Sequence, residues 1–233
     1  MSSRYPVAGP HVAVIPAAGY GTRMRGVDPS LPPGLPKELL PLAGMPIIFH
    51  SLLMAMEAGA RHAAVVLRPG KECLRRLLSD PETAASAFPQ SASAAAAIAA
   101  SLTLHFCYQE TPRGECDALA HAWPVIREHA AGAPVAVVYP DNFAAPRPGC
   151  RPVLQALAAA AAATGLETVA LMDPGPEPRD DISDSGRVRL CPWSGSPVLF
   201  DGSRYPAAVH EVGAFLHKAP GMFAPRFPGE LRT

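Results

Sequence analysis

Residues 12–23 read VAVIPAAGYGTR. The first four residues are apolar and three of them are β-branched, which predicts a short buried strand of a parallel sheet. The strand should end near Pro16 and continue into a loop of small residues that contains Gly19 and Gly21. Because glycine has no Cβ, the backbone N–H groups of such a loop can closely approach phosphate oxygens. The stretch therefore predicts a strand that leads directly into an anion-binding turn.

Strands and helices are expected to alternate from this stretch onward. Strands are predicted at Val12–Ile15, Ala63–Leu67, Leu102–Tyr108, Val135–Tyr139 and Thr168–Met172, of which the fourth is the most strongly apolar. Helices are predicted at Met45–Ala58, Lys71–Leu78, Ala95–Ala100, Asp117–Glu128 and Leu154–Ala163. This alternation predicts an α/β fold: a three-layer, Rossmann-like, mixed but mainly parallel sheet with helices on both faces.

The pattern changes after Asp173, where prolines and glycines become frequent. Short strands are predicted there at Arg187–Leu190 and Val209–Leu216. We interpret residues 173–233 as a smaller mixed lobe, attached to a core of residues 1–172 within a single domain.

Composition disfavours several classes of function. The 233 residues include 20 basic and 20 acidic side chains, so a general attraction to nucleic acid or to an acidic membrane is not expected. No apolar run reaches the roughly 18 residues that a membrane span needs, and residues 1–11 lack the apolar core of a signal peptide. The five cysteines are odd in number and contain no C-x-x-C motif, which indicates reduced thiols in a cytoplasmic protein. Any phosphate must therefore be bound by a local site.

Three charged residues are placed to form such a site. Arg23 ends the glycine turn, and a guanidinium group can donate two hydrogen bonds to a phosphate. Asp141 follows the strand predicted at 135–139, and a carboxylate at the carboxyl end of a parallel strand can hold Mg²⁺ beside phosphates. Lys37 lies in a segment bounded by prolines, which restrict its backbone. The alternative is that Asp141 and Asn142 only form a turn and that Lys37 is an ordinary solvated lysine.

A dinucleotide-dependent oxidoreductase is disfavoured. The third glycine of a G-x-G-x-x-G motif would stand at position 24, which is Met24. The second predicted strand is followed by Arg68, where such enzymes carry an acidic residue.

Several motifs, in their order along the chain, resemble those of the sugar-1-phosphate nucleotidyltransferases. Residues 12–24 (VAVIPAAGYGTRM) are followed by residues 36–42 (PKELLPL) and 45–48 (MPII). The similarity is greatest to the UTP–glucose-1-phosphate uridylyltransferases, followed by the dTTP-dependent glucose enzymes. Shorter resemblances occur at residues 70–71 (GK), 109–114 (QETPRG), 139–142 (YPDN) and 211–215 (EVGAF).

This resemblance implies a magnesium-dependent enzyme. It would transfer a nucleotidyl group from UTP, or from dTTP, to a sugar 1-phosphate such as glucose 1-phosphate and release pyrophosphate. Its partners would be the nucleoside triphosphate and the phosphorylated small-molecule acceptor, and a homo-oligomer is compatible with the family. Because this chemistry requires no histidine, we interpret the histidines, including His62 and His105, as structural.

The resemblance also implies roles for individual residues. The catalytic residues would be Arg23, Lys37 and Asp141, and Asp141 would bind the Mg²⁺. The nucleotide would be bound by Ala17, Ala18, Gly19, Gly21, Thr22, Arg23, Gln109 and Gly114, with Gln109 and Gly114 at the base. The acceptor would be bound by Asn142, Arg189 and Gly213.

Two departures from the family pattern leave other functions open. No Glu-Lys-Pro sequence follows Asp173, although the lysine of that motif meets the sugar phosphate in relatives. Residues 216–218 (LHK) lack the second metal-binding Asp of the dTTP-dependent relatives. One alternative is therefore a cytidylyltransferase acting on phosphocholine or a phosphonate. The other is a catalytically inactive nucleotide-binding paralogue.

Overall fold

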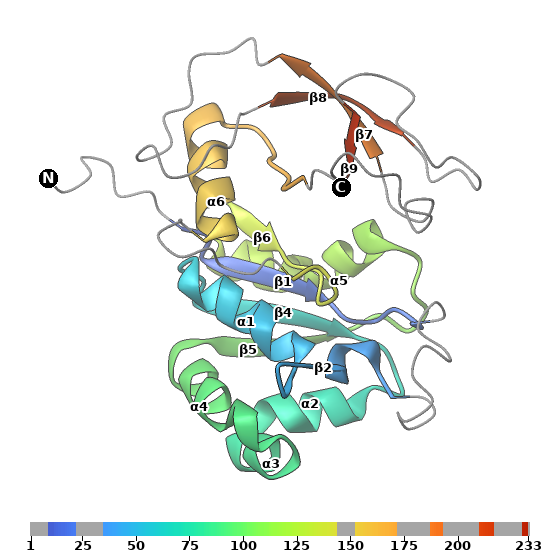
Figure 1. Cartoon of the computed structure of the whole chain (residues 1–233), viewed down its shortest axis with the longest axis vertical. Coiled ribbons are helices and arrows are strands. Elements are labelled where there is room, and N and C mark those ends of the chain that lie inside the picture. Colours follow the sequence, from blue (N-terminus) through green and yellow to red (C-terminus); the bar gives the residue numbers. More distant parts are fainter. Residues whose placement is uncertain are drawn as a thin grey trace, which may run out of the picture.

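The centre of the protein is a four-stranded parallel sheet with the strand order β5-β4-β1-β6 (Figure 1). The computed structural model describes residues 9–21, 35–143, 152–171, 187–192, 210–216 and 230–232. The strands of this sheet are β1 (Val12–Pro16), β4 (His62–Leu67), β5 (Thr103–Tyr108) and β6 (Val135–Val137). The chain runs outward from β1 through β4 to β5 and then returns to β6 on the other side of β1. The strand order therefore reverses between β1 and β6, the position where ligands bind in open α/β sheets.

Helices cover both faces of this sheet (Figure 1). One core joins Ala13 and Ile15 of β1 to apolar residues of five helices: α1 (Ile47–Glu57), α2 (Glu72–Ser79), α3 (Pro81–Ala87), α4 (Ala92–Ser101) and α6 (Val153–Thr164). The other core joins Val14 and Val66 to α5 (Glu115–His129). The two cores use alternate residues of β1 because successive side chains of a strand point to opposite faces. The expected α/β fold with helices on both faces is confirmed.

The segment before α1 differs from the prediction. A 3₁₀ turn, η2 (Lys37–Leu39), is followed by a small antiparallel hairpin of β2 (Pro41–Leu42) and β3 (Met45–Pro46). The helix predicted from Met45 therefore begins at Ile47, because Met45 and Pro46 pair with the preceding strand.

Two strand predictions need correction. The strand predicted at 135–139 as the most buried is only three residues long, half-buried, and at one edge of the described four-stranded sheet. Its apolar side chains indicated burial but could not reveal its position in the sheet. The strand predicted at Thr168–Met172 is not formed at residues 168–171, and Met172 lies outside the described residues. Instead, the Thr168 hydroxyl donates to the carbonyl of Leu157 in α6 (3.1 Å).

The alanine-rich stretch contains more helix than expected. In addition to α4, it forms α3 (Pro81–Ala87) and a 3₁₀ turn, η3 (Pro89–Ser91). The Asp80 side chain caps α3 by accepting a hydrogen bond from the Glu82 backbone N–H (3.0 Å). Pro81 occupies the first turn, where proline is compatible with a helix.

A second, antiparallel sheet has the order β8-β7-β9 and lies beyond the β6 edge of the first (Figure 1). Its strands are β7 (Arg187–Pro192), β8 (His210–Leu216) and β9 (Glu230–Arg232). The first two were predicted, although Val209 lies outside the described residues, and β9 was not. The division into a core of residues 1–172 and a lobe of 173–233 stays a prediction.

None of the helices in the described ranges is long and apolar enough to cross a membrane. Four of the five cysteines lie in those ranges, and each has a free thiol.

Candidate active site

Four loops meet at one edge of the central sheet because its strands are parallel and end on the same side. They begin at Ala17 after β1, Arg68 after β4, Gln109 after β5 and Val138 after β6. Three of these loops start with a backbone hydrogen bond to a neighbouring strand: Ala17 to Val66 (2.8 Å), Gln109 to Leu67 (2.8 Å) and Val138 to Val14 (2.9 Å). Their first residues are therefore held as firmly as the strands themselves.

Lys37 and Asp141 form an ion pair at this edge. The Lys37 Nζ donates to Asp141 Oδ2 at 2.6 Å, although 104 residues separate the two. The side chains are 21% and 48% exposed, so both are accessible to a ligand. A Cβ added at Gly21 would lie 3.9 Å from the carbons of the Lys37 side chain. The structure thus brings the glycine turn, Lys37 and Asp141 together.

The glycine turn has the backbone that its sequence suggests. Gly21 has a φ of +62°, a conformation that glycine adopts without the cost a side chain would add. Ala17 and Ala18 are buried, whereas Tyr20 is exposed. The Arg68 guanidinium lies 4.9 Å from the centre of the Tyr20 ring, which places a further positive charge beside the turn.

A second ion pair lies beneath the first and is buried. The Lys71 Nζ donates to Glu38 Oε2 (2.8 Å) and to the backbone carbonyl of Ala17 (2.7 Å). The two charged side chains are only 3% and 0% exposed. Burial lowers the pKa of Lys71, and the neighbouring Glu38 carboxylate opposes that change. This pair therefore links the loop after β1, the segment before α1 and the loop after β4. The sequence placed Glu38 and Lys71 in family-like segments but did not predict that they contact each other.

Gln109 is also buried, with 2% of its surface exposed. Its Nε2 donates to Asp117 Oδ2 (2.6 Å) and makes a longer hydrogen bond to the Gly114 carbonyl (3.4 Å). The hydrogen bond from Gln109 lowers the pKa of the Asp117 carboxyl group. Asp117 therefore fixes the orientation of the Gln109 amide. Asp117 was not among the predicted site residues. It lies in the first turn of α5, which begins directly after the family-like segment at residues 109–114.

Tyr139 connects the loop after β6 to the start of α5. Burial, together with the carboxylates of Glu115 and Asp141, raises the pKa of Tyr139 to about 12. The Tyr139 carbonyl accepts a hydrogen bond from the Asn142 N–H (3.0 Å), so residues 139–142 form a turn. A turn is therefore formed at Asp141 and Asn142, and it presents Asp141 to Lys37.

The remaining predicted residues are only partly described. Thr22 and Arg23 lie outside the described residues. Arg189 of β7 pairs in register with Ala214, and the register then shifts so that Gly213 is an additional residue in β8. Arg189 and Gly213 are therefore near each other in the second sheet.

A family model described as nucleotidyl transferase matches residues 12–179, which is more than half of the chain. This chain belongs to the nucleotidyl transferase family. The match begins at β1 and includes every loop at the carboxyl edge of the central sheet.

Curated proteins similar to this nucleotidyl transferase include two bifunctional GlmU proteins. The GlmU of Clavibacter sepedonicus is 48% identical over 64 residues, which are 27% of this chain and 12% of that protein. The GlmU of Paraburkholderia phytofirmans is 32% identical over 163 residues, which are 69% of this chain and 28% of that protein. The matching region therefore spans less than a third of the length of these relatives.

Solved structures with the same fold include UDP-glucose pyrophosphorylases. A UDP-glucose pyrophosphorylase complexed with UDP-glucose matches with a TM-score of 0.66 and 21% identity, over 89% of this chain and 69% of that one. The UTP-bound enzyme from Acinetobacter baumannii matches with a TM-score of 0.62 and 20% identity, over 95% of this chain and 73% of that one. The expected resemblance to sugar-1-phosphate nucleotidyltransferases is thus confirmed for family and fold.

The buried ion pair predicts a large effect on stability. Lys71→Ala should lower the free energy of unfolding by about 3–5 kcal/mol, because it leaves the Glu38 carboxylate buried without its cation. Urea unfolding followed by circular dichroism measures this change. Replacing both charges, as in Glu38→Leu with Lys71→Met, should restore part of the loss. A loss below about 1 kcal/mol in Lys71→Ala, the range of exposed pairs, would contradict the structural role.

Proposed function

We propose that this protein transfers a nucleotidyl group from a nucleoside triphosphate, with UTP favoured and dTTP as the other candidate, to a sugar 1-phosphate such as glucose 1-phosphate. An oxygen of the sugar phosphate would attack the α-phosphorus and form a new P–O bond. The bond from the α-phosphorus to the bridging oxygen would break, and pyrophosphate would leave with that electron pair. The attacking oxygen is already anionic, so no general base is required, and catalysis depends on positioning and charge neutralisation.

The observation that carries this proposal is the Lys37–Asp141 pair beside Gly21. It combines a flexible cation, an exposed carboxylate and a backbone turn able to approach phosphates, at the edge where the strand order reverses. An ammonium group on a long side chain can follow a phosphate as its charge changes in the transition state. Arg68 adds positive charge at the same turn, and we assign Arg23, outside the described residues, the same role.

Asp141 is also suited to hold Mg²⁺. A carboxylate oxygen is a ligand that Mg²⁺ prefers, and nearly half of the Asp141 side chain is exposed. The Lys37 ammonium lies 2.6 Å from this oxygen, which supports the proposal that a positive ion can bind there. When bound, Mg²⁺ would neutralise charge on the triphosphate. Lys37 would then be free to contact the phosphates, because the ion would take its place at the carboxylate.

Recognition of the base is assigned to Gln109 and Gly114. Asp117 fixes the Gln109 amide by accepting from Nε2, and an amide of fixed orientation presents a defined hydrogen-bonding pattern. A Cβ added at Gly114 would meet nothing within 4 Å, so this position has open space beside it. Support for a uracil-type base comes from the UDP-glucose pyrophosphorylases that share the fold. We assign Asn142, Arg189 and Gly213 to the acceptor.

A second candidate function is supported by the sequence after Asp173, which has no Glu-Lys-Pro motif. A cytidylyltransferase for phosphocholine or a phosphonate would use the same phosphate turn, Lys37 and Asp141 with a different acceptor site. An inactive nucleotide-binding paralogue would retain the nucleotide half only.

A substrate screen separates these functions. The chain is incubated with each of UTP, dTTP, CTP and ATP, with Mg²⁺ and either glucose 1-phosphate or phosphocholine, and pyrophosphate release is measured. We expect release with UTP or dTTP and glucose 1-phosphate, and none when the acceptor is omitted. Release only with CTP and phosphocholine would establish the cytidylyltransferase. Binding of UTP by calorimetry without turnover on either acceptor would establish the inactive paralogue.

Lys37→Ala should affect turnover far more than stability. Loss of a cation that acts on the transition state should lower kcat by about 10²–10³. The free energy of unfolding should change by less than about 1 kcal/mol, because the ion pair is exposed. Arg76→Ala, which removes an exposed positive charge from α2, is the matched control and should retain full turnover. An equal effect of both variants on kcat would remove Lys37 from the reaction.

Asp141→Asn should change the response to Mg²⁺. The amide lacks the negative charge that attracts the ion, so the Mg²⁺ concentration for half-maximal rate should rise at least about tenfold. This is measured by titrating MgCl₂ at saturating nucleotide. Glu82→Gln, which neutralises an exposed carboxylate in α3, is the control. An unchanged midpoint for Asp141→Asn would exclude this carboxylate as the ligand.

A further inference from the structure

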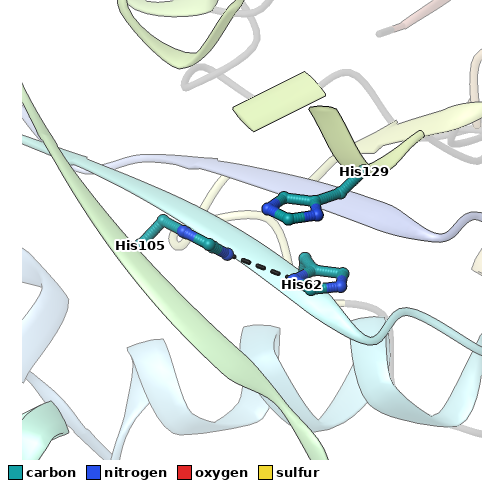
Figure 2. Close-up of side chains that lie close together, drawn as sticks. All are labelled: His62, His105 and His129. Carbon is teal, nitrogen blue, oxygen red and sulfur yellow. Dashed lines mark hydrogen bonds between the residues drawn. The ribbon is translucent and has the colours of Figure 1, made fainter. Parts of the chain in front are cut away.

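Three histidines from separate elements, His62, His105 and His129, gather in one cluster (Figure 2). His62 is the first residue of β4, His105 lies in the first half of β5, and His129 is the last residue of α5. All three lie on the face of the sheet that α5 covers. His62 and His105 point to this face because they alternate along their strands with residues of the core on the other face. His62 opens a strand whose carboxyl end borders the candidate active site, so the cluster lies toward the opposite edge of the sheet.

The ring nitrogens are close enough to share a ligand. His62 Nδ1 and His105 Nε2 are 3.1 Å apart. The rings of His62 and His129 are stacked with centroids 3.9 Å apart, and those of His105 and His129 are 5.0 Å apart. One nitrogen from each ring lies within 4.8 Å of the others, and within the described parts of the chain this is the one such group of three or more His, Cys, Asp or Glu side chains.

The environment favours neutral rings. Burial lowers the pKa of both His62 and His105, and the nearby His129 ring acts in the same direction on each. The contact between His62 and His105 also requires at least one nitrogen to be an unprotonated acceptor. Neutral imidazole is the form that binds metal ions, and imidazole is a preferred ligand of Zn²⁺, Ni²⁺ and Cu²⁺.

We propose that His62, His105 and His129 form a binding site for a divalent transition-metal ion of the Zn²⁺ class. With Zn–N bonds of about 2.0–2.1 Å, tetrahedral geometry requires nitrogens about 3.3 Å apart, close to the 3.1 Å between His62 and His105. The His129 ring must turn out of its stack, since parallel rings cannot both point at one ion. His129 ends its helix and is only half-buried, which leaves room for this rotation.

The remaining coordination position has two suitable occupants. Glu128 Oε1 lies 3.8 Å from His129 Nε2, and the Glu128 side chain is 75% exposed and free to turn. Water is the other. Three nitrogen ligands distinguish this site from Asp141, because Mg²⁺ prefers oxygen ligands. A bound ion would connect the end of α5 to β4 and β5, three elements that the chain brings together only when folded. Metal binding should therefore raise the temperature of unfolding.

Calorimetry tests the site directly. The full chain, without a histidine tag and stripped with EDTA, is titrated with ZnCl₂ in excess MgCl₂, which occupies oxygen-ligand sites. We expect one equivalent of Zn²⁺ to bind and the unfolding temperature to rise. His105→Gln and His129→Gln should each weaken binding by more than about 100-fold, beyond the roughly 10–100-fold that the loss of an outer hydrogen bond typically costs. His210→Gln, at an exposed histidine of β8, is the matched control and should bind as the unsubstituted chain does.

The proposal is overturned if Zn²⁺ does not bind stoichiometrically, or if both cluster variants retain the affinity of the unsubstituted chain. Circular dichroism in EDTA verifies that each variant is folded. A measurement on the unsubstituted chain needs no variant: bound Co²⁺ should give the visible absorption of a four-coordinate nitrogen and oxygen site. Sulfur-to-cobalt charge-transfer bands in the near ultraviolet would instead assign the metal to cysteines and overturn the proposal, as would the absence of visible bands.

Discussion

The buried contact of Lys71 with Glu38 and the Ala17 carbonyl holds the carboxyl edge of the sheet together. It joins the glycine turn after β1, the proline-bounded segment before α1 and the loop after β4. The last of these begins only a few residues before Lys71. A charge in an apolar interior is tolerated only when it is paired and hydrogen-bonded. Neither side chain can therefore move away without leaving the other as an unpaired buried charge. That constraint fixes Glu38, and through the adjacent backbone it fixes the position from which Lys37 extends.

Neighbouring residues in η2 thus contribute to two ion pairs of different character. Glu38 points inward to a partner that water does not reach, whereas Lys37 points outward to Asp141, which is half exposed. The inner pair is suited to hold loops in place. The outer pair is weak in water and readily exchanged, which suits the proposed function, in which Lys37 and Asp141 would separate to contact phosphates and a metal ion. The difference in burial therefore separates the pair that positions the loops from the pair that is proposed to take part in the reaction.

The helix α5 connects the candidate active site to the histidine cluster. Its first turn carries Asp117, which orients Gln109, and its last residue is His129 of the histidine cluster. Pro124 lies within this helix without ending it, so both ends belong to one continuous element. A metal ion at one end and a nucleotide at the other would each order the same helix against the same sheet face.

The sequence alone was sufficient for the features that depend on near neighbours. The apolar run and glycine turn at residues 12–21, most helices and the motif resemblance follow from local patterns. It could not show that β6 lies at an edge of the sheet formed by the described strands, since an apolar strand does not reveal how many strands flank it. Nor could it pair Lys37 with Asp141, 104 residues away, or gather three histidines from separate elements. Those contacts exist because parallel strands place distant segments side by side, which only the tertiary structure decides.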